Sequence, residues 1–369
     1  MTVKSNSMIK KEPLFHIVKR SDIKKGRAWL IRVSAGLIAL LICGIVNAVL
    51  TRGRFVEFYI ELFNGAFGTE RRIWNLLQNT ALLLSVAIAV TPSFKMRFWN
   101  IGAEGQVLMG ALACVVCVVY FGDKLSNPLL ILVMLAFSVI AGAIWAVLPA
   151  IFKAQWNTNE TLFTLMMNYI AMNLVAFCIN KWSPDGSGTM GLLKFGHFPK
   201  IANQAYLLNI IIVIVLTAVL YIYLRFSKHG YEISVVGESE KTAKYIGINV
   251  KKVIVRTMIL SGVLCGIVGL LLVGGTHHTI NTNLAGGRGF TAILVSWLAH
   301  FNPLMMMVTS FLVVFLQQGS GQVATALNMG ASAAYSEIIV GIFFFFIIGC
   351  EFFLNYKVKF RSVKKEAKK

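Results

Sequence analysis

Residues 289–336 read GFTAILVSWLAHFNPLMMMVTSFLVVFLQQGSGQVATALNMGASAAYS. These 48 residues contain no Asp, Glu, Lys or Arg, and a charge in the middle of a bilayer costs about 2.5 to 3.5 kcal/mol on insertion scales. As one helix the run would extend about 72 Å, more than twice a hydrocarbon core of about 30 Å. The chain must turn within it, and Asn302-Pro303 is the predicted place, because proline disfavours helix in the preceding residue.

The rest of the chain has the same character. Of its 369 residues, 57% are apolar and 14% charged, against about 45 to 50% and about 25% in soluble proteins. This composition excludes a soluble enzyme and predicts an all-α polytopic membrane protein with about ten (8–10) transmembrane helices. The expected spans are 28–50, 73–91, 101–121, 128–151, 161–181, 206–226, 254–275, 287–300, 303–318 and 336–355. The eighth and ninth are short, as re-entrant or protein-covered segments can be.

The net charge is +20, and the distribution of the positive residues along the chain predicts how the protein is oriented in the membrane. If the N-terminus is cytoplasmic, the inner segments hold 25 of the 35 Lys and Arg residues and the outer segments hold 9. Positively charged loops stay on the cytoplasmic side, so both termini are predicted to be cytoplasmic and no nucleic-acid partner is expected. The domain prediction is a basic arm at 1–27, a transmembrane domain at 28–355 with a cytoplasmic loop at 227–253, and a basic tail at 356–369.

The chain carries none of the common enzyme motifs. It has no G-x-x-x-x-G-K-[ST] loop for a nucleoside triphosphate, no H-E-x-x-H and no G-x-S-x-G. The adjacent His277 and His278 point in different directions on a helix, which is poor geometry for one metal. We therefore expect no catalytic residue, no metal and no cofactor in this chain, and any ATP must be hydrolysed elsewhere.

Polar side chains inside the predicted spans require a partner or a path. Glu104 lies in Asn100-Ile-Gly-Ala-Glu-Gly-Gln106, and a second group at the fifth span places Thr164 and Asn168 on one helix face. A polar stripe faces either neighbouring helices or a water-filled path, since lipid satisfies neither donors nor acceptors. Both interpretations stay open, as does a helix-start carboxylate stabilised by the helix dipole. The candidate pathway residues are Asn100, Glu104, Gln106, Asn159, Thr164, Asn168, Phe290 and Glu337.

Two further patterns predict contacts. Gly262, Gly266 and Gly269 form a ridge of small residues in the seventh span, which is typical of close helix packing. In the large inner loop, Ser239 can cap a helix that Gly247 ends. A helix of about eight residues is marginal alone and needs a surface to pack on. A membrane-surface helix and a docking site for a cytoplasmic partner are the two interpretations.

Several segments together resemble a known family. They are Asn100–Gln106, Leu165-Met-Met-Asn-Tyr-Ile170, Gly237-Glu-Ser with Tyr245-Ile-Gly-Ile-Asn249, Gly289-Phe-Thr-Ala-Ile293 with Asn302-Pro303, and Ser336-Glu-Ile338. In this order they look like the permease subunits of bacterial ABC importers for ribose-type sugars, branched-chain amino acids and nucleosides. Within that group the chain most resembles permeases of nucleoside (guanosine-type) importers.

The resemblance implies a multi-pass protein of the bacterial cell (inner) membrane that forms part of a path for nucleosides. It implies a second permease subunit, most simply in a heterodimer, an extracytoplasmic substrate-binding lipoprotein, and a cytoplasmic ATPase that binds ATP-Mg. Surrounding membrane lipid is a further partner. The inner loop is similar to the family's ATPase-coupling loop, with contacts expected from Gly237, Glu238, Ser239, Ala243, Tyr245, Gly247 and Ile248.

Other functions stay open at this point. The same importer type could carry simple sugars or another small polar solute. An ion-coupled secondary transporter would use Glu104 or Glu337 as its intramembrane carboxylate. A membrane enzyme is the weaker alternative, because the sequence lacks a recognisable nucleophile or metal constellation.

Overall fold

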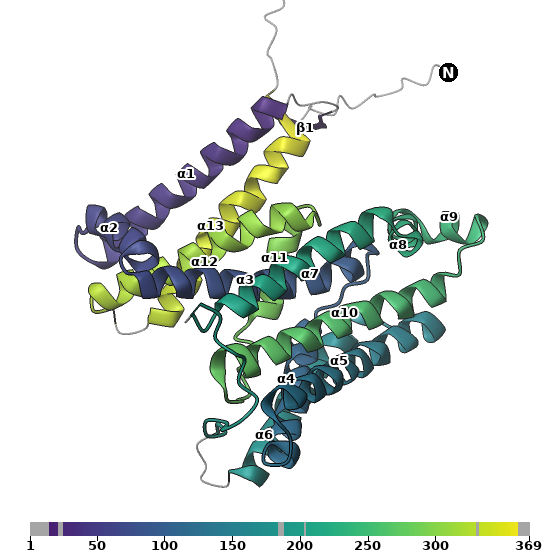
Figure 1. Ribbon diagram of the computed structural model, residues 1–369. Coiled ribbons are helices and arrows are strands. Elements are labelled where there is room, and N and C mark those ends of the chain that lie inside the picture. Colours follow the sequence, from purple (N-terminus) through teal and green to yellow (C-terminus); the bar gives the residue numbers. More distant parts are fainter. Residues whose placement is uncertain (1–14, 21–24, 184–187, 203, 330–331, 361–369) are drawn as a thin grey trace, which may run out of the picture. The chain divides into compact units, whose positions relative to one another are not determined.

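The computed structural model describes residues 15–20, 25–183, 188–202, 204–329 and 332–360 (Figure 1). Parts of the predicted basic arm (1–14 and 21–24) and tail (361–369) lie outside these ranges. The elements are β1 (Phe15–Lys19), α1 (Lys25–Leu50), α2 (Phe55–Phe67), α3 (Glu70–Lys95), α4 (Ala103–Phe121), α5 (Asn127–Trp156), α6 (Glu160–Trp182), α7 (Leu207–Phe226), α8 (Lys228–Glu238), α9 (Glu240–Tyr245), α10 (Val250–Leu272), the π-helix η1 (Val273–His277), α11 (Arg288–Leu298), α12 (Pro303–Ala326), α13 (Ser332–Asn355) and β2 (Tyr356–Phe360).

The helices confirm an all-α polytopic membrane protein. Within the described residues, nine helices are long and apolar enough to cross a membrane. The predicted turn at Asn302-Pro303 is correct, since α12 begins at Pro303. The predicted end of that span at 318 is wrong, because α12 continues through the polar run 317–322 to Ala326. Helix α2 was not predicted, because its 13 residues include Glu57 and Glu61 and do not form an apolar run of spanning length.

The chain divides into two compact units, residues 1–62 with 320–369 and residues 63–319. In the first unit α1 and α13 pack together, and an ion pair joins Arg32 to Glu351 at 3.1 Å. Strands β1 and β2 pair antiparallel, with Phe15 opposite Phe360. The two ends of the described chain therefore lie on one side of the membrane, which requires an even number of crossings.

In the second unit α10 is the central helix, with 78% of its spanning window buried. A Cβ atom on Gly266 would overlap with the Ser138 carbonyl oxygen, and one on Gly262 with the backbone of Gly142. Gly269 approaches the backbone of α4 at Ala111 in the same way. The predicted glycine ridge is thus the surface on which α4 and α5 pack against α10.

Helix α11 is too short to form the remaining predicted crossing by itself. Its 11 residues span about 16 Å, roughly half of a hydrocarbon core. Arg288 hydrogen-bonds to Asn79 of α3 and Ser296 to the Ala87 carbonyl, both at 3.1 Å, so α11 runs parallel to α3 and begins about 14 Å from the start of that helix. The irregular residues 278–287 connect η1 to α11 and would have to supply the rest of the crossing. The span predicted at 287–300 is therefore the helical half of a discontinuous crossing.

We predict that Gly266→Ala destabilises the protein by about 1 to 3 kcal/mol, because the added methyl group must displace the backbone of α5. The measurement is thermal unfolding of the purified protein in detergent. The matched control is Gly341→Ala in α13, where a Cβ meets nothing within 4 Å and the higher helix propensity of alanine stabilises slightly. Equal unfolding temperatures for the two variants would contradict this packing account.

Candidate functional site

The segment between α7 and α10, predicted to be an inner loop, folds into two short helices with well-defined ends. The side chain of Ser227 caps α8, and that of Ser239 caps α9 by accepting the Thr242 N–H at 3.2 Å. Gly247 has a φ of +85°, a left-handed conformation that favours glycine, and Asn249 caps α10 through the Lys252 N–H. The predicted cap and stop of the second helix are both confirmed.

The residues predicted to contact an ATPase fall into two groups. Gly237 and Ala243 are buried and Ser239 and Ile248 are partly buried, so these four face the protein interior wholly or in part. Glu238, Tyr245 and Gly247 are exposed, and 92% of the surface of Tyr245 is accessible. Tyrosine is one of the residue types enriched at the energetic centres of protein interfaces.

Two contacts attach this segment to the spanning helices. A Cβ atom on Gly237 would overlap with the Lys95 carbonyl oxygen, so α8 lies directly on the end of α3. The buried His229 ring contacts the Tyr223 hydroxyl at 2.7 Å and the Thr257 hydroxyl at 3.2 Å. Burial lowers the pKa of His229 below its ordinary value of 6.5, and the charge of Arg256 lowers it further. The neutral ring therefore joins α7, α8 and α10, a role that the sequence analysis missed.

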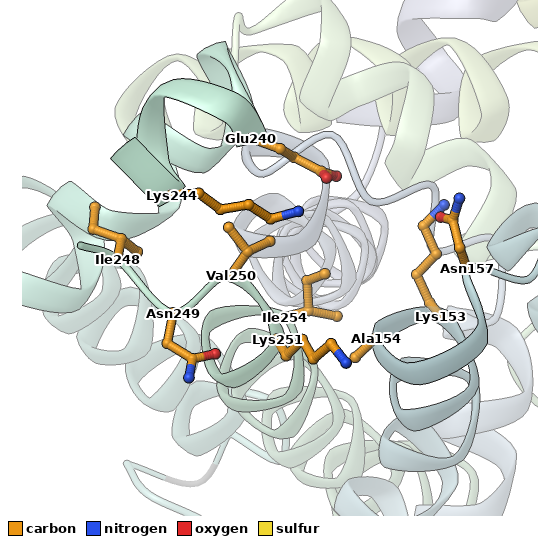
Figure 2. A pocket seen from close by; sticks show the side chains of 10 residues that line it. All are labelled: Lys153, Ala154, Asn157, Glu240, Lys244, Ile248, Asn249, Val250, Lys251 and Ile254. Atoms are coloured by element: carbon orange, nitrogen blue, oxygen red, sulfur yellow. The ribbon is translucent and has the colours of Figure 1, made fainter. Parts of the chain in front are cut away.

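A cavity of about 550 Å³ lies between α9 and the adjoining ends of α5 and α10. Figure 2 shows the side chains around it, with Glu240 and Lys244 extending from α9 and Lys153 and Lys251 reaching in from the two spanning helices. Lys153 forms an ion pair with Glu160 at 2.9 Å. The cavity separates the exposed part of the loop from the membrane domain and leaves space under α9.

Glu104 is the centre of a second site, inside the membrane domain. Only 2% of its surface is exposed, and its two carboxylate oxygens accept the N–H groups of Gly287 and Gly289, each at 2.8 Å. These N–H groups belong to the start of α11 and have no carbonyl partner within that helix. Arg288, between them in the chain, donates to Asn79. Glu104 thus anchors the half-helix at its positive end.

The polar residues around Glu104 bind one another. Asn100 donates to Gln106 at 3.4 Å and to Ser261 of α10 at 3.3 Å, and all three are buried. Thr164 accepts the Ile101 N–H. The contacts join the start of α4 to α10 and α6.

Asn168 completes this cluster from α6. Its side chain accepts the Gly105 N–H at 2.8 Å and donates to the Ile101 carbonyl at 2.9 Å. Gly105 has no room for a side chain, because a Cβ atom would lie 2.8 Å from the side-chain amide oxygen of Asn168. Hydrogen bonds to a neighbouring helix or to the turn before α4 are present at five of the eight candidate pathway positions: Asn100, Glu104, Gln106, Thr164 and Asn168.

The other three candidates lie elsewhere. Asn159 caps α6 by accepting the Leu162 N–H at 3.1 Å. Glu337 is exposed on α13, in the compact unit that does not contain Glu104. Phe290 is 43% exposed on the face of α11 opposite the α3 contacts.

An exposed face of α11 contains more than Phe290. Leu294 and Trp297 follow at helical spacing and are 37% and 50% exposed. Trp297 contacts Trp99 with ring centroids 5.5 Å apart, and Trp99 in turn contacts Phe94 at 5.7 Å. Neither tryptophan was among the predicted site residues, because the sequence carries no signal that pairs two residues so far apart in the chain.

Comparison with known sequences identifies the family. The branched-chain amino acid transport system permease component family matches residues 72–348, which cover most of the helices described above. The chain belongs to this permease family.

Named relatives of the permease transport different solutes. It is 28% identical to a glucose ABC transporter permease of Haloferax volcanii over 87% of its own length and 88% of the relative's. It is 26% identical to a guanosine ABC transporter permease of Bacillus subtilis, with 90% and 93% covered, and 25% identical to a nucleoside ABC transporter permease of Lactococcus lactis, with 78% and 82% covered. Each of these two bacteria has a second permease of the same description that also matches.

We predict that Glu104→Gln lowers the stability of the permease by about 1.5 to 3 kcal/mol, because the amide keeps one acceptor and places a donor against a backbone N–H. Thermal unfolding in detergent measures the loss. Glu337→Gln, which neutralises an exposed carboxylate in another spanning helix, is the control and should leave stability unchanged. A Glu104 variant as stable as the Glu337 variant would show that the two hydrogen bonds do not hold α11.

Proposed function

We propose that this permease forms part of the translocation path of an ATP-driven nucleoside importer in the bacterial cell membrane. The observation that carries the proposal is the exposed face of the half-helix α11. Nonhelical backbone at membrane depth is tolerated only where protein covers it or where it lines a water-filled path. Asn283 and Gly286, in the irregular half of the crossing, are exposed. This side of the chain therefore faces a partner or a path and not lipid.

The chemistry of that face suits a nucleoside. Phe290 and Trp297 present aromatic surfaces about 10 Å apart along α11, and a nucleobase stacks on such surfaces without needing a charge. The guanosine and nucleoside descriptions of two relatives support this substrate class. The aromatic contact between Trp99 and Trp297 lies at the inner end of the face, where it narrows the path.

A single chain of this kind supplies one wall of the path. A second permease would supply the other, and the paired relatives in Bacillus subtilis and Lactococcus lactis support a heterodimer. Because the sequence has no nucleotide-binding loop, ATP-Mg would be bound and hydrolysed by a cytoplasmic ATPase. An extracytoplasmic binding lipoprotein would deliver the substrate.

The exposed residues of α8 and α9 would receive the ATPase. Tyr245 and Glu238 would contact it, while Gly237 transmits a displacement to the end of α3. The neutral His229 bridge ties the same movement to α7 and α10. A rigid lever of this kind would couple ATP binding to access from one side of the membrane or the other.

A sugar is the second candidate substrate, supported by the glucose permease of Haloferax volcanii. Aromatic surfaces also bind the apolar faces of sugars, and the buried amides offer no charge that excludes either class. A nucleoside should depend more strongly than a sugar on stacking against an aromatic ring, so changes to the exposed aromatic residues of α11 can distinguish the two substrates.

We predict that Phe290→Ala raises the KM for guanosine uptake about tenfold to a hundredfold, the loss expected for one base–aromatic stack. The assay is uptake of labelled guanosine, with labelled glucose in parallel, by cells that express the complete transporter. Phe290→Tyr should restore uptake. The matched control is Phe177→Ala, which removes a 67% exposed phenylalanine from α6. Saturable uptake of glucose and not of guanosine would overturn the nucleoside assignment, and uptake that survives ATP depletion but collapses with an ion gradient would overturn the ATP-driven one.

We predict that Tyr245→Ser abolishes uptake while the permease folds normally, because the side chain is almost fully exposed and contributes little to packing. The measurements are uptake, copurification of the ATPase and substrate capture by the binding lipoprotein. The first two should fall and the third should not change. Lys241→Ser, an exposed change on the same short helix, is the control. Normal uptake by the Tyr245 variant would contradict the docking role.

A further inference from the structure

A basic groove lies beside the coupling segment, between the inner ends of α5 and α10. It has a volume of about 410 Å³ and is lined by Ile151, Ala154, Gln155, Lys251, Lys252, Val255 and Arg256. Three of these seven residues are cationic and, within this described lining, none is acidic. The remaining walls are largely apolar. A groove that combines positive charge with an apolar floor fits an anionic amphiphile.

Neighbouring aromatic residues place the groove at the membrane surface. Trp156, the last residue of α5, is 63% exposed and contacts Phe152 with ring centroids 5.1 Å apart. Exposed tryptophan at a helix end is typical of the headgroup region of a bilayer. Ile151 lies about one turn deeper, at the level where acyl chains begin.

The positive charges of the groove are only partly balanced by the chain itself. Arg256 approaches Glu232 at 3.9 Å, and the side chain of Arg256 is still 60% exposed. Lys153, on the neighbouring turn of α5, is paired with Glu160. Lys251 and Lys252 are exposed and enter none of the salt bridges observed among the described residues.

We propose that this groove binds an anionic phospholipid of the inner leaflet. The headgroup phosphate lies against Lys251, Lys252 and Arg256, and one acyl chain runs along Ile151 and Val255. Basic pockets between spanning helices on the cytoplasmic side bind such headgroups. The apolar floor favours a lipid over free phosphate, which has no acyl chain to fill it.

The proposed lipid site adjoins the coupling segment. Lys251 and Ala154 line both this groove and the cavity under α9 that Figure 2 shows. A lipid phosphate at Lys251 would therefore reduce the positive charge that faces Lys244 across that cavity. Because the two cavities share these residues, lipid binding in the groove would affect the position of α9. This effect is separate from the proposed substrate path.

Native mass spectrometry of the detergent-purified chain tests the proposal, with phosphatidylglycerol and phosphatidylcholine as probes. The intact protein should retain phosphatidylglycerol in preference. Lys251→Gln with Lys252→Gln should weaken its binding about thirtyfold, since each charge near a headgroup contributes about a fivefold factor. The matched control, Lys124→Gln with Lys194→Gln, removes two exposed charges elsewhere in the same unit and should leave binding unchanged.

A second variant separates the lipid from other anions. Val255→Trp fills the apolar floor without changing charge and should also reduce phosphatidylglycerol binding. Inorganic phosphate at millimolar concentration should not displace the lipid. Equal retention of both lipids, normal binding by the double lysine variant or by Val255→Trp, or displacement by phosphate would each overturn the proposal. So would loss of ATPase copurification in the double lysine variant with unchanged lipid binding, which would assign these lysines to the protein partner.

Discussion

Two hydrogen bonds from the backbone of Gly287 and Gly289 to the carboxylate of Glu104 make the broken crossing of this permease possible. The first N–H groups of a helix have no intrahelical partner, and at membrane depth water does not replace it. A buried helix start such as Gly289 needs an acceptor from another part of the protein, and Glu104 supplies it. Gly289 is required by the same contact, since a Cβ atom would lie 2.7 Å from the carboxylate. The position of Glu104 thus sets where α11 starts, and with it which side chains α11 exposes.

The framework behind Glu104 explains why the polar residues of α4 and α6 are buried. Asn168 binds the backbone at Gly105, one residue after Glu104, and Asn100 binds Ser261 of α10. Each contact fixes the start of α4 against a different helix. A carboxylate that must meet two N–H groups needs this rigidity, because hydrogen bonds weaken steeply with misalignment. The same side chains can therefore support a path without lining it.

Much of the fold could be predicted from the sequence, because hydrophobic length is a strong signal in membranes. The nine long helices match predicted spans, and the caps at Ser239 and Gly247 follow from local backbone chemistry that needs no distant partner. The partners of Glu104 could not be predicted, since they lie more than 180 residues away in the chain. The continuation of α12 beyond Gln318 to Ala326 was missed for a related reason. Gln318 donates to the carbonyls of Gly65 and Arg72, and such distant acceptors make a polar stretch compatible with a spanning helix.

A series of contacts within residues 63–319 joins the α8–α9 segment to the half-helix α11. Gly237 of α8 lies on the Lys95 carbonyl, the chain continues from there to Trp99, and Trp99 contacts Trp297 of α11. The backbones at Gly237 and Lys95 are in direct contact, so a displacement of α8 has to move the end of α3 or break the contact. The three residues between Lys95 and Trp99 include Arg97, whose φ of +61° lies in the left-handed region that is typical of a turn. A movement at the membrane surface would thus reach an aromatic pair beside the proposed path through one short, tightly turned segment.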